Sequence, residues 1–211
     1  MQTKPHAVVH AAPVHTLHNP DGSPATDDYW YEPDFSGDQP LCRPDAGWAV
    51  LTSFIRNATR LLRKSPFRED IQQLFVRYAQ ALDRSDEDTA FVNLWGVLES
   101  VTQTGRANYD KTIARATWIY EDREQAAEEL GYLRMQRNRI VHASASTQDG
   151  GSSVHQLKAI VDSHLRHLLV NTFKVTSIQE YASLLDLPAS TATLRHKRDE
   201  LNKALRFHAV L

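Results

Sequence analysis

At residues 128–142 the chain reads EELGYLRMQRNRIVH, and its apolar residues recur with the spacing of an amphipathic helix. At about 100° per residue, one face of a helix over 122–143 gathers five apolar side chains: Ala126, Leu130, Leu133, Ile140 and Val141. Arg137 stands in the middle of that face, and Asn138 and His142 lie on its flank. The segment predicts a core-facing helix and raises the question of why its apolar stripe contains a cation.

The same periodicity extends over most of the chain from Gly47 onward. Helices are predicted near 48–62, 71–82, 86–101, 109–120, 122–143, 153–174, 177–186 and 190–206. The core is predicted to include Trp48, Leu51, Phe91, Trp95, Leu98, Leu133 and Val141. No segment shows strand-like alternation bounded by hairpin turns. The predicted fold class is therefore all-α, a bundle of about seven helices.

The first 46 residues have a different character. Seven of the nine prolines lie in the first 44 residues, which prevents a sustained helix there. We expect residues 1–46 to form an irregular N-terminal extension to a helical domain at 47–211. The same segment holds His6, His10, His15 and His18. These could bind a metal, but their irregular spacing favours a polar arm, so no metal site is predicted.

The overall composition excludes several classes of protein. The 211 residues carry a formal charge of −2, so any nucleic-acid surface has to be local. Cys42 is the only cysteine, which excludes an intramolecular disulfide. No stretch approaches the roughly 18 apolar residues of a membrane span. The start of the chain is interrupted by proline and histidine and is unlike a secretory signal. We expect a cytoplasmic protein with no membrane partner.

Arg137 has three interpretations, because burying a lone guanidinium costs on the order of several kcal/mol. Its side chain could extend to solvent, or it could pair with an acid such as Glu99 on a neighbouring helix. The third interpretation is that it faces a cleft or a second subunit and binds phosphate there. Asn138 and His142 share a face at i,i+4 spacing, so the amide could orient the ring. A titratable His near a helix end, an Arg and a polar neighbour suit metal-free phosphodiester chemistry.

At these residues the sequence resembles a known family. An Arg followed by a polar residue, a short spacer and a His near the end of a long helix is similar to the signature of HEPN domains, here Arg137, Asn138 and His142. The stretch FVNLWGVLES at 91–100 resembles the Apea-like HEPN branch, whose helix carries a similar Leu-Trp…Leu-Glu pattern. The resemblance covers about 48–175 well and the last two helices loosely.

The resemblance implies a helical bundle that forms a homodimer and cleaves RNA without a metal or other cofactor. In that scheme His142 acts as general base or acid toward the 2′-hydroxyl, and Arg137 holds the scissile phosphate. Asn138 orients both, and Glu99 positions Arg137. In the dimer that the resemblance implies, two copies of the helix would bring Arg134, Arg137 and Arg139 together twice. That makes a local basic groove for RNA.

Two functions are therefore expected as alternatives. The first is a metal-independent endoribonuclease of HEPN type, a toxin or anti-phage defence effector, with an antitoxin or a sensor protein as a further partner. The second is a non-catalytic HEPN-like module that binds RNA or nucleotide, or only dimerises. Ser144 stands where members paired with a nucleotidyltransferase antitoxin typically have Tyr, so the resemblance does not extend to that regulatory scheme.

Other polar groups are interpreted as solvated surface. His164, His167 and Asp162 could ligate a metal from one helix, but a third ligand at suitable spacing is missing. A solvated helix face is therefore favoured for them. The same interpretation applies to the basic series Arg56, Arg60, Arg63 and Lys64, and to the mixed-charge stretch RHKRDELNK at 195–203.

Overall fold

The structure is a computed structural model that describes residues 14–31, 46–84, 86–105, 108–143 and 150–209. Eight helices lie in these residues: α1 (Ala46–Lys64), α2 (Arg68–Leu82), α3 (Glu87–Thr102), α4 (Tyr109–Thr117), α5 (Arg123–Ala143), α6 (Gly150–Val170), α7 (Ile178–Leu185) and α8 (Thr191–His208). The all-α fold class is confirmed, and each helix lies close to a predicted segment. Among the described residues, none of the helices has the length and apolar character needed to cross a bilayer.

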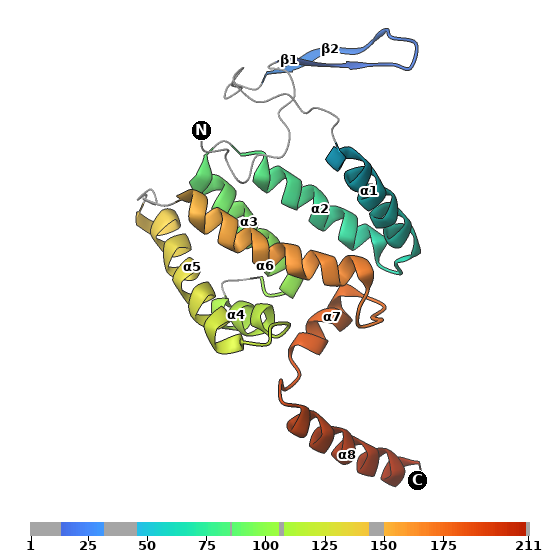
Figure 1. Ribbon diagram of the computed structural model, residues 1–211, viewed down its shortest axis with the longest axis vertical. Coiled ribbons are helices and arrows are strands. Elements are labelled where there is room, and N and C mark those ends of the chain that lie inside the picture. Colours follow the sequence, from blue (N-terminus) through green and yellow to red (C-terminus); the bar gives the residue numbers. More distant parts are fainter. Residues whose placement is uncertain (1–13, 32–45, 85, 106–107, 144–149, 210–211) are drawn as a thin grey trace.

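Helix α3 is the centre of the bundle (Figure 1). It contacts α2, α4, α5, α6 and α7. Its sequence EDTAFVNLWGVLESVT is apolar on more than one face, which is typical of a helix covered from several sides. Asp86 caps its first turn by accepting a hydrogen bond from the Thr89 amide. The central helix therefore fixes the positions of α4 and α5, which carry the residues of interest.

The predicted core is correct for four residues and wrong for three. Phe91, Trp95, Leu98 and Leu133 are at most 1% exposed. Trp48, Leu51 and Val141 are 48%, 45% and 43% exposed. The two α1 residues belong to the N-terminal half of a helix whose half-buried leucines lie at its other end, and Val141 lies in the last turn of α5. Periodicity identifies an apolar face but does not show whether another element covers its whole length.

The N-terminal segment contains a β-hairpin, so the prediction of no strands and of a wholly irregular extension is wrong. Strand β1 (Val14–His18) pairs antiparallel with β2 (Pro24–Tyr31). Gly22 takes a left-handed φ of 84° in the turn and donates its amide to the Asn19 carbonyl. Pro24 is the first residue of its strand, where a missing amide is tolerated. The prolines of this segment exclude a helix but are compatible with these strands, and Gly22 makes the turn between them.

The N-terminal histidines are only partly placed. The His18 ring contacts Thr16 Oγ1 at 2.9 Å and the Gly22 carbonyl at 3.0 Å. The side chains of the other three histidines, and residues 1–13 and 32–45 as a whole, lie outside the described residues.

Helix α8 projects from the bundle beyond α7 (Figure 1). None of its side chains is buried, and Leu201, Leu205 and Phe207 are each more than 60% exposed. The surface character predicted for 195–203 is therefore confirmed. The basic residues of α1, namely Arg56, Arg60, Arg63 and Lys64, are also exposed, as predicted.

Candidate nucleic-acid site on helix α5

The inner face of α5 carries Arg137 in line with buried leucines. Leu130 and Leu133 are fully buried, and Arg137 and Ile140 continue the same face as half-buried residues. Helix α5 packs with this face against α3, α4 and α6. The predicted placement of a cation within the apolar stripe is therefore correct.

The main neighbour of Arg137 is an aromatic ring. Its guanidinium carbon lies 5.0 Å from the centre of the Tyr109 ring, within the range of a cation–π contact. Its Nη1 donates a weak hydrogen bond of 3.4 Å to Asn138 Oδ1, and its buried Nε has no hydrogen-bond partner among the described residues. Arg134 lies over the same ring at 5.4 Å and pairs with Asp110 at 2.6 Å. Two guanidinium groups thus share one ring.

Glu99 reaches this cluster only indirectly. Its Oε1 accepts a hydrogen bond of 3.1 Å from Trp95 Nε1, and the Trp95 ring packs edge-on against Tyr109 at 6.2 Å. Within the described part of the chain no ion pair joins Glu99 to Arg137. The direct pair considered from the sequence is not formed, and Trp95 and Tyr109 lie between the two charges.

The remaining predicted residues lie at the outer end of α5. His142 is exposed, and none of the described residues gives it a hydrogen bond or an ion pair. Arg139 is exposed, and the half-buried Asn138 contacts Arg137 and not the His142 ring. Because five helical residues turn by about 140°, Arg137 points inward and His142 outward. A single chain therefore does not bring the two side chains together.

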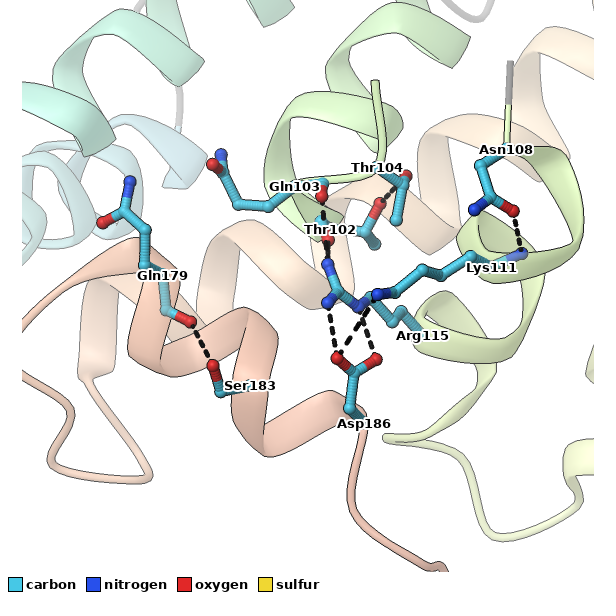
Figure 2. A network of polar contacts seen from close by, with 9 residues as sticks. All are labelled: Thr102, Gln103, Thr104, Asn108, Lys111, Arg115, Gln179, Ser183 and Asp186. Atoms are coloured by element: carbon cyan, nitrogen blue, oxygen red, sulfur yellow. Dashed lines mark hydrogen bonds and ion pairs between the residues drawn. The ribbon is translucent and has the colours of Figure 1, made fainter. Parts of the chain in front are cut away.

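A second arginine, Arg115 of α4, is buried and has a purely structural set of partners (Figure 2). It is 7% exposed and makes a two-pronged pair with Asp186, from Nε at 2.7 Å and from Nη2 at 2.6 Å. Its Nη1 donates to the carbonyls of Thr102 and Gln103 at the end of α3. Hydrogen bonding from Arg115 lowers the pKa of the Asp186 carboxyl. Every guanidinium nitrogen of Arg115 has a protein partner, which is not true of Arg137.

His164 is also structural, and the prediction that it belongs to a solvated face is wrong. It is fully buried, and its ring bridges the Ala116 carbonyl at 2.9 Å and the Tyr181 hydroxyl at 2.8 Å. A carbonyl can only accept, so Nε2 carries the proton and Nδ1 accepts from Tyr181. Burial lowers the pKa of His164 to about 4. The described residues contain no group of three or more His, Cys, Asp or Glu side chains suited to a metal ion.

Comparison with known proteins does not assign a function to these residues. No family model, curated protein or solved structure matches the chain. The likeness to HEPN domains therefore rests on Arg137, Asn138, His142 and the 91–100 stretch. Sequence reasoning missed Tyr109, Asp110 and the Arg115–Asp186 pair. Two signals pointed to Tyr109 and Asp110: they lie at the start of a predicted helix, and the next predicted helix is rich in arginine. No pattern in a single sequence indicates that residues 115 and 186 are in contact.

Proposed function

We propose that this protein is a metal-independent endoribonuclease of the HEPN type. Arg137 binds the scissile phosphate, and His142 transfers the protons. The observation that supports this most is the state of Arg137: an always-charged side chain in an apolar face, with a buried Nε lacking a partner and no carboxylate beside it. A phosphate that accepts hydrogen bonds from the terminal nitrogens of Arg137 would neutralise its charge.

Arg115 and Arg137 differ in the partners that the fold provides. Leaving a buried donor unsatisfied costs about 1–3 kcal/mol, so proteins normally supply a partner. Arg115 has a carboxylate and two carbonyls as partners, whereas the described residues give Arg137 only an aromatic ring and a weak amide contact. A site kept for a ligand explains the difference, because the ligand brings the missing acceptor.

The chemistry follows from these groups. His142 takes the proton of the ribose 2′-hydroxyl, and the resulting oxygen attacks the adjacent phosphorus. The bond from phosphorus to the 5′-oxygen breaks, and that oxygen receives a proton from an imidazolium. The products are a 2′,3′-cyclic phosphate and a 5′-hydroxyl end. Arg137 stabilises the extra charge of the transition state, and Asn138 orients its guanidinium. Arg134 and Arg139 bind neighbouring phosphates.

The proposed active unit is a homodimer. Arg137 points inward and His142 outward within one copy, so one catalytic site needs residues from both copies. The outward face of α5 carries Tyr132 and Met135, which are 48% and 59% exposed and suit a contact between two copies. A two-fold contact through this face brings the two copies of His142 together, and each Arg137 side chain would have to extend from the edge of its helix toward the same cleft. Such an enzyme would act in the cytoplasm as a toxin or defence effector held in check by an antitoxin or sensor.

Incubation of the purified protein with total RNA in EDTA tests this proposal. We expect cleavage that persists in EDTA and leaves the two ends named above. His142→Ala should lose on the order of 100-fold in rate if the ring transfers protons. The matched control is His155→Ala, which alters an exposed histidine on α6. Equal cleavage by wild type and His142→Ala would rule out an endoribonuclease that uses His142.

A non-catalytic RNA-binding module is the second candidate. The observation in its favour is that His142 has no orienting partner among the described residues and does not contact Arg137. Under this alternative neither wild type nor variant cleaves RNA. Binding of RNA should then still weaken when Arg134 or Arg137 is replaced by Ala.

A further inference from the structure

We propose that Tyr109 is a positioning residue whose ring holds Arg134 and Arg137 together as one two-cation site for a phosphate group. The proposal rests on the site described under the proposed function. It goes further by naming the ring as the part that assembles the site. The ligand class is a phosphate, either the phosphodiester of RNA or inorganic phosphate.

The Tyr109 ring is held in place by its own surroundings. Tyr109 is the first residue of α4, directly after Asn108, whose side chain caps the helix by accepting from the Lys111 amide. Its ring packs edge-on against Trp95, which is 1% exposed and donates its indole N–H to Glu99. A ring fixed by a helix cap on one side and a core tryptophan on the other can serve as a rigid support.

The ring holds two like charges that would otherwise repel. The guanidinium carbons of Arg134 and Arg137 lie 5.4 Å and 5.0 Å from its centre. The negative π-face of an aromatic ring attracts cations within about 6 Å. Asp110, the next residue of α4, anchors Arg134 through an ion pair of 2.6 Å. No carboxylate in the described part of the chain pairs with Arg137, so the ring is its main electrostatic partner there.

This arrangement leaves donors free for an anion. Arg134 uses one nitrogen for Asp110, and Arg137 uses one for a weak bond to Asn138. A phosphate accepts several hydrogen bonds and prefers the planar fork of arginine. The Arg134 side chain is 36% exposed while it pairs with Asp110, so part of it stays accessible from solvent. Both guanidinium groups therefore keep donors from which a phosphate can accept hydrogen bonds.

The aromatic ring, and not the hydroxyl, should matter. The Tyr109 hydroxyl makes no hydrogen bond with the described residues. Tyr109→Phe keeps the π-face and the contact with Trp95. Tyr109→Leu keeps much of the apolar volume but removes the π-face. The two substitutions therefore form a matched pair.

Nuclear magnetic resonance of arginine Nε–H groups tests the proposal without any activity. In wild type and Tyr109→Phe, the Arg134 and Arg137 signals should carry the ring-current shift and should both move on titration with inorganic phosphate. In Tyr109→Leu the shift should vanish, and phosphate affinity should fall on the order of tenfold. The Arg115 Nε–H signal reports an intact fold in all three. Unchanged Arg137 shift and phosphate affinity in a folded Tyr109→Leu protein would overturn the proposal.

RNA cleavage separates this proposal from the proposed function. If wild type cleaves, Tyr109→Leu should lose kcat on the order of tenfold while Tyr109→Phe stays near wild type. If wild type does not cleave but phosphate moves both arginine signals in a Tyr109-dependent way, the ribonuclease proposal fails and the two-cation site stands. Equal kcat for the Leu and Phe variants of an active enzyme would count against positioning by the ring.

Discussion

Arg115 and Asp186 lie 71 residues apart and are joined by two charge-assisted hydrogen bonds of 2.7 Å and 2.6 Å (Figure 2). The same guanidinium takes the carbonyls of Thr102 and Gln103, where α3 ends with Gln103 in a left-handed conformation. One side chain therefore closes the end of the central helix and fixes α4 to the end of α7.

Arg115→Leu should destabilise the protein by about 3 kcal/mol, because Asp186 keeps only its 3.6 Å ion pair with Lys111 and two carbonyls lose the Arg115 donor. Urea unfolding followed by tryptophan fluorescence measures the loss. The control is Arg198→Leu, which breaks the exposed pair of Arg198 with Asp199 on α8 and should change stability by less than about 0.5 kcal/mol. Equal stability of the Arg115 and Arg198 variants would show that the network is not structural.

Arg137→Leu should have the opposite outcome. The substitution removes a buried N–H without a partner and leaves no carboxylate unpaired, so we expect stability unchanged or raised by about 1 kcal/mol. RNA cleavage or binding should fall strongly in the same variant. Urea unfolding of wild type and Arg137→Leu measures the change in stability. A loss of stability as large as that of Arg115→Leu would mean that Arg137 serves the fold.

Stability should fall as the pH is lowered because His164 is buried in its neutral form. Its pKa is 6.5 in an ordinary setting and about 4 in the folded protein, because burial and the nearby His167 disfavour its charge. The stabilising contribution is therefore complete above pH 6.5 and is lost as the pH falls toward 4. The free energy of unfolding should be about 2 kcal/mol lower near pH 5 than near pH 7.5.

The variant that checks this assignment is His164→Gln, which keeps a polar side chain but cannot titrate. It should be less stable than wild type at neutral pH and should show a flatter dependence between the two pH values. A slope as steep as that of wild type would place the pH dependence on another group.

Met135→Glu should weaken the homodimer. Met135 is 59% exposed on the outward face of α5, and two glutamates facing each other across a two-fold axis repel. Sedimentation at tens of micromolar should show wild type as a dimer and the variant as a monomer of unchanged helical content. Leu201→Glu, on the exposed face of α8, is the matched control and should remain dimeric. A monomeric wild type would contradict the proposed dimer.

The sequence was enough to predict which segments are helical and which face of α3 and α5 turns inward. Phe91, Trp95 and Leu133 repeat with helical spacing and are buried. The spacing of apolar residues could not show that the first half of α1 is exposed to solvent. Its exposure depends on how far the neighbouring helices extend along it. The spacing also could not separate a buried histidine from a surface one. His164 is buried because the Ala116 carbonyl and the Tyr181 hydroxyl satisfy its ring from distant parts of the chain.

The candidate site was predictable only in part, for a similar reason. Arg137 was conspicuous because its position on the helix is apolar. The ring that holds it comes from another helix, and no spacing rule connects residues 109 and 137. The expected partner, Glu99, was chosen as the acid on a neighbouring apolar stripe. In the structure Glu99 instead accepts a hydrogen bond from the Trp95 indole.

Helix α8 has a consequence for how unfolding is observed. Its 18 residues bury no side chain, so its helical hydrogen bonds are supported by little tertiary packing. Heating should fray α8 gradually, before the bundle unfolds in one cooperative step around Trp95. Circular dichroism should then show a sloping loss of helix below the transition, while tryptophan fluorescence stays flat because α8 contains no tryptophan. The two probes will not coincide, and a two-state fit to the dichroism alone will underestimate the cooperativity of the bundle.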